Sequence, residues 1–371
     1  MYPFNWKKSV KVVRILAWAY LRHRVKRTPL WGHLYVTRKC NLRCGYCFFR
    51  DPKKRDLSTD EIRAVLDRMH AMGISFLAFH GGEPTIRKDF DAIVRHAHDV
   101  GFFTYLNTNG TMLTPEYIDR LGEAGVDLIN MSVDSVVEFE HSGKDLMHGK
   151  KVLEDLLEAR ERHGFEITVN FVLNNRNIEV ARQTLELMHS YRIPISVGFI
   201  VKHLFHDEQE PSLFFRTEAE KRRLFEVLDE IIVMRRRGMN IIEPTRYFED
   251  LKRFVNHELE WECMAGRDSI GIDTLGELKF CGTLPTEDVS IFDLERLDTR
   301  VLHRWRKDKY GNCHERCVTN CRYVTYYYYK HPLRFVLEMA WFRRAVRSIR
   351  DRLSTLLGRP PRLGPSVPVR I

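Results

Sequence analysis

Cysteine is scarce in this sequence: 8 of the 371 residues are cysteines, and all of them fall into two groups. Secreted modules that depend on disulfides are usually short chains with a much higher density of cysteine. The chain is long enough to bury a large core, and no small-residue cleavage site follows the apolar stretch near its N-terminus. We therefore expect no disulfide framework, and we expect the grouped cysteines to bind metal.

Acidic residues are missing from one end of the chain and rare at the other. Residues 1–32 contain none and carry a net charge of +8, and residues 331–371 carry +7. Because the whole chain carries +10, residues 33–330 are mildly acidic at −5. We therefore expect four parts: two basic terminal segments (1–32 and 331–371), a catalytic body at 33–240 and a cysteine-rich domain at 241–330.

Long apolar runs are also missing. The uncharged stretch at 15–21 has seven residues, whereas a helix that spans a bilayer needs about 20. From Phe335 to Leu356, apolar side chains recur at spacings of three and four, which is typical of one amphipathic helix. Two interpretations of the basic ends stay open: docking on an anionic membrane from the cytoplasmic side, or packing of two helices against the protein. A groove for nucleic acid has no motif in its favour.

Strand and helix patterns alternate six times after residue 32, as in a parallel β/α fold. A capping box at Ser58–Glu61 predicts a helix that runs to Ala71, and Thr114 followed by proline predicts the start of another. The predicted strands are 33–37, 75–79, 103–106, 127–133, 166–173 and 195–200. We therefore predict an α/β fold, a partial (β/α)6 barrel whose active site lies at the carboxyl ends of the strands.

Polar residues and candidate metal ligands occur at the same place in each repeat, at or directly after the end of a predicted strand. Three cysteines follow the first strand, and His80-Gly-Gly-Glu-Pro84 follows the second. Asn107–Gly110 follows the third strand, Ser132 and Asp134 end the fourth, and Asn170 lies on the fifth. Each segment alone could be an ordinary turn. Their shared position predicts a single active site at one rim.

The first cysteine group has the spacing C-x3-C-x2-C at Cys40, Cys44 and Cys47. Three thiolates can hold three irons of a cubane cluster and leave the fourth iron open, because no fourth thiolate is close in sequence. Buried thiols or half of a zinc site are the alternatives. The motif resembles the signature of the radical S-adenosylmethionine (radical SAM) enzymes, and the resemblance covers residues 33 to about 200.

The resemblance implies a 4Fe-4S cluster that binds S-adenosylmethionine and reductively cleaves it to a 5′-deoxyadenosyl radical, which abstracts hydrogen from a substrate. It also implies which residues bind this cofactor. Gly81, Gly82 and Glu83 match the segment that contacts the methionyl ammonium, either through Glu83 or through the backbone carbonyls of the glycines. Ser132 would contact the carboxylate or ribose. The same cleft would be lined by Thr108 or Asn109, with Tyr46 near the adenine and Gly198 allowing its close approach.

The second cysteine group begins with Cys263 and Cys281, which flank an expected β-hairpin. Their spacing, C-x12-G-x4-C, resembles the opening of SPASM and twitch domains, which carry auxiliary iron–sulfur clusters. The ending departs from that pattern, with only Cys313, Cys317 and Cys321 at spacings of four, which would share one face if the segment were helical. We expect one auxiliary cluster held by the first two cysteines and two of the last three, while a second cluster or a zinc site stays open.

We therefore expect a radical SAM oxidoreductase or a maturase that forms C–X bonds. Its substrate would be a peptide or a lipid-like, membrane-borne molecule, and its electron donor a flavodoxin or ferredoxin. The alternative is an iron–sulfur electron carrier or redox sensor that does not cleave S-adenosylmethionine.

Asp273 lies where some relatives keep a proton-accepting acid, but its position predicts a role in the hairpin turn.

Overall fold

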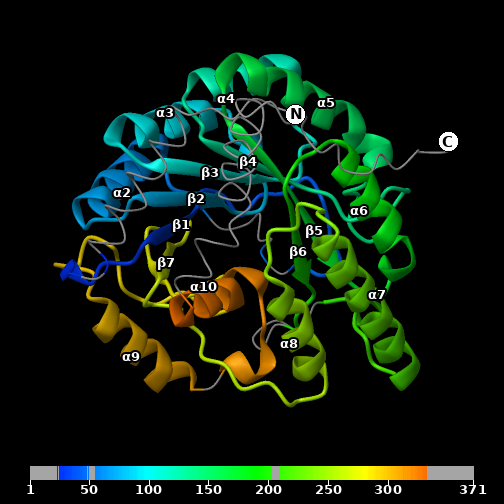
Figure 1. Ribbon diagram of the computed structural model, residues 1–371. Helices are drawn as coiled ribbons and strands as arrows, with labels where there is room; N and C mark the ends of the chain where they lie inside the picture. Colours follow the sequence, from blue (N-terminus) through cyan, green and yellow to red (C-terminus); the bar gives the residue numbers. More distant parts are fainter. Residues whose placement is uncertain are drawn as a thin grey trace, which may run out of the picture.

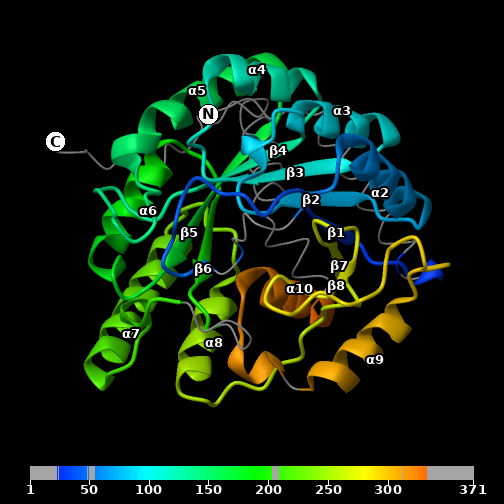
Figure 2. The same cartoon turned by 180° about the vertical axis from the view of Figure 1, so that it is seen from behind.

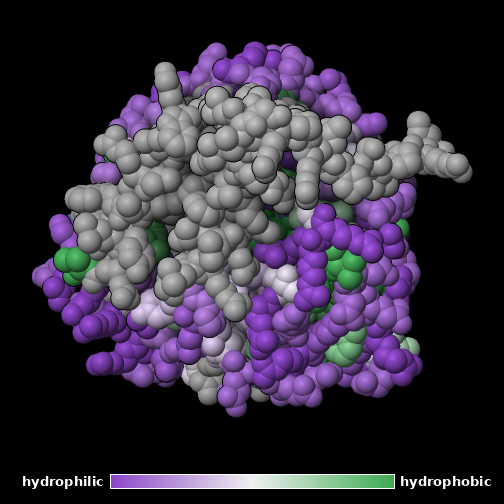
Figure 3. Space-filling view, viewed as in Figure 1, coloured by the Kyte–Doolittle hydropathy of each residue, from purple (hydrophilic) through white to green (hydrophobic). Residues whose placement is uncertain are grey.

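The computed structural model describes residues 23, 25–47, 49, 55–202, 209–311 and 313–331. The apolar stretch predicted at 15–21 and the amphipathic helix predicted from Phe335 onward lie outside these residues. Within the described part of the chain, no helix is long and apolar enough to cross a membrane. On the face seen in Figure 3, the surface of the described residues is mostly hydrophilic.

An eight-stranded sheet with the order β6-β5-β4-β3-β2-β1-β7-β8 forms the centre of the molecule (Figure 1). All neighbouring strands are parallel except β7 and β8, which form an antiparallel hairpin. The strands are β1 (Trp31–Tyr35), β2 (Phe76–His80), β3 (Phe103–Thr108), β4 (Leu128–Ser132), β5 (Glu166–Leu173), β6 (Ile195–Phe199), β7 (Ser269–Ile272) and β8 (Leu278–Lys279). The predicted parallel α/β architecture is confirmed, with β1 beginning two residues earlier than expected.

Helices cover the outer face of the curved sheet (Figures 1 and 2). They are α2 (Thr59–Ala71), α3 (Phe90–Val100), α4 (Pro115–Glu123), α5 (Leu146–His163), α6 (Ala181–Ser190) and α7 (Glu218–Arg236). The predicted capping box is present, because Ser58 and Glu61 each accept a hydrogen bond from the other's backbone N–H. Thr114 caps α4, with Pro115 at its first position. Local capping chemistry therefore fixes these two helix starts.

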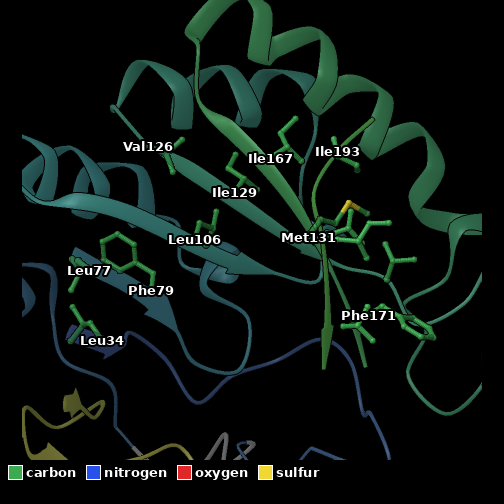
Figure 4. Close-up of a cluster of buried hydrophobic side chains, with 14 of the residues drawn as sticks. Leu34, Leu77, Phe79, Leu106, Val126, Ile129, Met131, Ile167, Phe171 and Ile193 are labelled. Carbon is green, nitrogen blue, oxygen red and sulfur yellow. The ribbon is translucent and has the colours of Figure 1, made fainter. Parts of the chain in front are cut away.

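The two faces of the strands differ in character. In β1, Leu34 is fully buried in the core beneath the helices, whereas its neighbours His33 and Tyr35 are half-buried on the opposite face. Figure 4 shows the helix-facing layer, with Leu34, Leu77, Phe79, Leu106 and Ile129 among its members. A Cβ on Gly32 would lie 2.4 Å from the Met69 side chain, so β1 and α2 pack closely. This apolar layer fixes which side chains point into the barrel.

The inner face of the sheet carries a row of polar side chains across successive strands. Asn107 Nδ2 lies 3.4 Å from His80 Nδ1, and Asn130 Nδ2 donates to Asn107 Oδ1 at 2.9 Å. Thr168 Oγ1 donates to Asn130 Oδ1 at 2.8 Å. These hydrogen bonds link β2, β3, β4 and β5 across the barrel interior. The interior is therefore polar, unlike a barrel filled only by apolar layers.

The C-terminal part of the chain completes the ring around this interior. The predicted hairpin is present, and its strand β7 extends the main sheet by pairing with β1. The remaining helices are α8 (Thr245–Val255), α9 (Thr299–Tyr310) and α10 (Asn320–Lys330), and α8 and α10 lie between the two edges of the curved sheet (Figure 1). The last three cysteines do not share one helix: Cys313 begins a short 3-10 helix (Cys313–Arg316), Cys317 follows it in a loop and Cys321 lies in α10.

Candidate active site and auxiliary cysteine pocket

Two adjacent glycines fix the position of the loop that carries the first cysteine group. Gly82 N–H donates to Thr37 O and Glu83 N–H donates to Lys39 O, both at 2.8 Å. A Cβ on Gly82 would lie only 2.1 Å from Lys39 O, and one on Gly81, whose φ is +149°, only 2.4 Å from Thr37 O. The two glycines therefore allow the turn after β2 to contact the backbone that leads into Cys40.

The three thiols of this loop are accessible to different degrees. Cys40 and Cys44 are half-buried and Cys47 is exposed. Burial raises the pKa of Cys44 to about 11; Lys144 lowers it, while Asp134 and the other two thiolates raise it. Thiolates are the species that bind metal, so the positive charge of iron would favour their deprotonation. Each of the three thiols follows β1 in the same loop, beside the turn after β2.

Their arrangement does not suit a single metal ion. Among the described residues, which include all eight cysteines, no three His, Cys, Asp or Glu side chains converge on one ion position. A cubane needs a wider spacing, because each thiolate binds a different iron. A cluster held by these three cysteines stays a prediction from their spacing in the sequence.

Glu83 is buried and its carboxylate is fully used within the protein. It is 1% exposed, and its oxygens accept hydrogen bonds from the N–H and hydroxyl of Thr85, the hydroxyl of Thr108 and the N–H of Asn109. Burial raises the pKa of Glu83, while these four donors act in the opposite direction. Glu83 therefore ties the end of β3 to the turn after β2. Its contact with the methionyl ammonium stays a prediction, as does that of Thr108.

Asn109 joins the same rim to the cysteine loop. Its Nδ2 donates to Asn41 Oδ1 at 3.0 Å, and its Oδ1 accepts from the N–H and hydroxyl of Thr111. Asn41 Nδ2 in turn donates to Thr111 Oγ1 at 2.7 Å. This closed set of bonds holds the segment between Cys40 and Cys44 against the end of β3.

Tyr46 belongs to a polar cluster next to the three thiols. This cluster could not be predicted from the sequence. Its hydroxyl donates to Asp134 Oδ2 at 2.5 Å and accepts from Lys144 Nζ at 3.0 Å. Burial alone would lower the pKa of Lys144, but Tyr46, Cys44 and Asp134 raise it overall. Lys144 therefore places an ammonium beside the predicted cluster. No local sequence signal distinguishes it from an ordinary surface lysine.

Ser132 and Asn170 face each other across β4 and β5. Both are half-buried, and neither side chain has a hydrogen-bond partner within the part of the chain that the structure describes. Their polar atoms are thus available to a ligand at the rim. Gly198 faces Asn320 of α10, and a Cβ there would lie 3.7 Å from that side chain, an ordinary contact. The predicted roles of Ser132 and Gly198 in binding S-adenosylmethionine stay predictions.

Four cysteines of the second group line one pocket. They are Cys263, Cys281, Cys313 and Cys317, which share the pocket with Arg306 and Arg322. Cys321 is exposed and does not line this pocket. Four thiols around one enclosed space match the full ligand set of a single cubane cluster.

The two arginines of this pocket are buried with little exposed surface, 1% for Arg306 and 4% for Arg322. Arg306 Nη1 lies 3.7 Å from Cys313 Sγ, and Arg322 contacts Asp268 at 3.5 Å. The Nε atom of each is buried and has no hydrogen-bond partner among the described residues. Buried cations need compensating negative charge. A cluster with four thiolate ligands is anionic, so the residues of this pocket fit such a group.

Asp273 shapes the hairpin turn, as predicted. Its Oδ1 accepts from the N–H groups of Leu275 and Glu277, and its Oδ2 forms an ion pair with Arg38 at 3.2 Å. The Asp273 carboxylate is therefore fully engaged in the turn and in the contact with the cysteine loop.

Comparison with known proteins gives a family match for the residues of the barrel. The family model described as "Radical SAM superfamily" matches residues 34–215. The curated Fe-coproporphyrin III synthase from Methanosarcina barkeri is 29% identical over 176 residues, which cover 46% of this chain and 42% of that protein. The match therefore spans less than half the length of this relative.

Solved structures share the fold over most of the chain. SuiB from Streptococcus suis, bound to S-adenosylmethionine, superposes with a TM-score of 0.59 at 18% identity, covering 85% of this chain and 74% of SuiB. The structure of anSMEcpe with AdoMet and the Cp18Cys peptide gives a TM-score of 0.55 at 16% identity, covering 78% of this chain and 88% of anSMEcpe. At these identities the similarity concerns the fold alone.

Proposed function

We propose that this chain is a radical SAM enzyme that reductively cleaves S-adenosylmethionine and abstracts hydrogen from a substrate, because residues 34–215 match the Radical SAM superfamily model. The observation that carries this proposal is the rim after β1, where three thiols of one loop meet the Gly81-Gly82 turn. We propose an oxidation or the formation of a C–X bond as the overall reaction, with an auxiliary cluster taking part.

Cys40, Cys44 and Cys47 would hold the 4Fe-4S cluster, which supplies the electron that cleaves S-adenosylmethionine when both are bound. The carbonyls of the glycine turn are the proposed acceptors for the methionyl ammonium, because the Glu83 carboxylate already accepts four hydrogen bonds. The free side chain of Ser132 is the proposed partner of the methionine carboxylate or the ribose. Asn109, Tyr46 and Gly198 would line the remaining cleft.

The auxiliary cluster is proposed for the pocket of Cys263, Cys281, Cys313 and Cys317. Support comes from the four thiols around one space and from the two buried arginines, whose Nε atoms have no hydrogen-bond partner among the described residues. This assignment leaves Cys321 outside the cluster. A second auxiliary cluster has no further set of thiols to hold it, because Cys321 is then the one cysteine of the eight without a proposed cluster.

A peptide is the substrate class that we propose. SuiB has been solved with its precursor peptide SuiA, and anSMEcpe with peptides, and both share this fold over most of the chain. The second candidate is a lipid-like molecule at a membrane, because the basic segments 1–32 and 331–371 contain apolar stretches. A reduced flavodoxin or ferredoxin is the proposed electron donor.

Reconstitution of the full-length protein tests the proposed activity. After anaerobic loading with iron and sulfide, addition of dithionite and S-adenosylmethionine should yield 5′-deoxyadenosine, detected by mass spectrometry. The electron-carrier alternative predicts a reducible cluster without this product. A protein that carries its full iron content, shows a reduced cluster by electron paramagnetic resonance and forms no 5′-deoxyadenosine would contradict our proposal in favour of that alternative.

The ligand set of the auxiliary pocket gives a separate prediction. Cys317→Ser should lower the iron content by about four atoms per chain, because this thiol lines the pocket. Cys321→Ser is the matched control and should retain full iron, since Cys321 lies in the same segment but outside the pocket. The measurement is iron and sulfide analysis of the reconstituted proteins. Equal losses in both variants would show that Cys321 is also a ligand.

A further inference from the structure

Two histidines form a pair on the inner face of the barrel. His33 Nδ1 and His80 Nε2 lie 2.9 Å apart, on the neighbouring strands β1 and β2. Their side chains point inward, because Leu34 and Phe79 beside them are buried beneath the helices. At this distance one imidazole donates its N–H to the lone pair of the other, so the pair as a whole has room for one additional proton. Nothing in the cleavage of S-adenosylmethionine uses this pair.

Arg322 connects the histidine pair with the auxiliary pocket. Its side chain lines that pocket, donates to Phe280 O at 3.0 Å and donates to Ser269 Oγ. Ser269 begins β7, which pairs with β1 so that Trp31 lies beside Ser269 and His33 beside Gly271. The guanidinium therefore lies between the four thiols and the strand that carries His33.

Tyr35 gives a second connection between the same two places. Its ring lies 5.4 Å from that of His80. A Cβ on Gly282, the residue after Cys281, would lie 2.9 Å from the Tyr35 hydroxyl. Tyr35 thus lies between His80 and the segment of Cys281 and Thr283 that lines the pocket, so charges in the two places interact through protein rather than water.

Burial and the nearby positive charge of Arg322 favour the neutral form of both histidines. Burial, and to a smaller extent the positive charge of Arg322, lower the pKa of His80 to about 4. Burial, His80 and Arg322 likewise lower the pKa of His33. Tyr35 from β1 and Tyr105 from β3 have raised pKa values and stay uncharged at neutral pH. Asp268, the partner of Arg322 at 3.5 Å, is the carboxylate that faces this region from the start of β7.

We propose that the auxiliary cluster and the His33–His80 pair form one proton-coupled electron acceptor, in which reduction of the cluster by one electron is accompanied by uptake of one proton by the pair. This inference rests on the auxiliary cluster proposed above. The electron makes the cluster one unit more negative, which offsets the repulsion that Arg322 exerts on a protonated imidazole. The proton comes from the substrate or from water, so charge and atoms balance.

The arrangement suits the oxidation of a substrate radical. A carbon radical that carries an adjacent N–H or O–H group becomes a neutral C=N or C=O product when it loses one electron and one proton. The pocket on one side of Arg322 would take the electron, and the imidazole pair on the other side would take the proton. The structure thus assigns the base to His33 and His80, which leaves Asp273 in the hairpin turn.

The midpoint potential of the auxiliary cluster as a function of pH tests this coupling without a substrate. The potential is measured by redox titration with electron paramagnetic resonance, in the full chain carrying Cys40→Ala, Cys44→Ala and Cys47→Ala so that one cluster remains. We expect it to become more negative as the pH rises between about pH 5 and 7. One proton per electron corresponds to at most about 59 mV for each tenfold change in proton concentration.

In the same background, His33→Gln with His80→Gln should make the potential independent of pH over this range. His189→Gln is the matched control, since His189 is exposed at the end of α6, and it should keep the wild-type slope. A slope that persists in the double variant would assign the proton to Asp268 and overturn the proposal. Lys279, whose pKa burial lowers to about 8, would instead act at higher pH.

Two results separate failure of the coupling from failure of the proposed function. A cluster signal with a potential that is flat from about pH 5 to 7 in the histidine-intact protein overturns the coupling alone, whether or not the double variant folds. Absence of any signal from the second cysteine group refutes the auxiliary cluster and the coupling together. Circular dichroism of each variant reports whether the fold is intact.

Discussion

Replacement of Cys44 by alanine is expected to abolish formation of 5′-deoxyadenosine. Cys44 is half-buried, its Sγ lies 3.5 Å from the carbonyl oxygen of Ser142, and it sits between the other two thiols of the loop. A cubane that is left with two protein ligands loses one iron site or dissociates. Without the cluster no electron reaches S-adenosylmethionine, so the expected effect is loss of product to below detection rather than a reduced rate.

The fold should survive this change, which makes the result interpretable. A serine or alanine at the rim removes few core contacts, and large losses of stability come from the buried core. Arg43→Ala is the matched control in the same loop, because Arg43 is exposed and has no ion pair among the described residues. It should retain iron and activity. Product formation by a Cys44→Ala protein would show that the cluster is held elsewhere.

Iron analysis gives an independent measure of the same change. Cys44→Ala should lose about four irons per chain and keep the auxiliary cluster, because the two cysteine groups lie on separate elements. Loss of all iron would instead indicate that the variant misfolds. The two measurements together separate a missing cluster from a missing fold.

Local patterns in the sequence were sufficient to predict the parallel α/β fold and the rim at which the strands end. The Ser58–Glu61 capping box and the Thr114-Pro115 cap act over four residues or fewer, and both are present where they were predicted. The strands place their following segments at one rim because parallel strands share their carboxyl ends. The rim could therefore be predicted from the position of each motif directly after a strand. This prediction required no knowledge of contacts between residues that are distant in the sequence.

The auxiliary pocket depended on contacts that no local pattern encodes. Arg322 binds Phe280 O, which is 42 residues away, and Arg306 binds Cys263 O, which is 43 residues away. In the sequence both look like arginines of basic helices. Spacings of four between Cys313, Cys317 and Cys321 suggested a common helical face, but the chain leaves the helical path between them. Tertiary packing decides which of the three thiols meet Cys263.

The polar side chains inside the barrel could not be predicted from the sequence either. His33 and His80 are 47 residues apart and meet only because β1 and β2 are neighbours. The ammonium group was predicted to bind Glu83 or the backbone carbonyls of the glycines, which stays a prediction. The sequence did not show that the Glu83 oxygens also accept four hydrogen bonds from Thr85, Thr108 and Asn109. A motif residue can thus be required because it positions its neighbours.

Among substitutions that add one methyl group at the rim, Gly82→Ala is expected to lower the stability of the protein most. The new Cβ would lie 2.1 Å from Lys39 O and 2.5 Å from the Lys39 carbonyl carbon. These are backbone atoms, which cannot rotate away as a side chain can. The turn after β2 would have to separate from the cysteine loop and break the bonds from Gly82 N–H to Thr37 O and from Glu83 N–H to Lys39 O. We expect a loss of about 3 kcal/mol in the free energy of unfolding.

Gly198→Ala is the matched control, because the added Cβ would lie 3.7 Å from the Asn320 side chain, a normal contact distance. Urea unfolding of the iron-free proteins measures both variants, and Gly198→Ala should stay within about 0.5 kcal/mol of the wild type. Gly82→Ala should also lose iron from the first cluster, since Cys40 directly follows the displaced Lys39 carbonyl. If Gly82→Ala unfolded like the wild type and kept its iron, the glycine turn would not be what holds the cysteine loop in place. The stability of the loop would then have to come from the bonds of Asn41, Asn109 and Thr111.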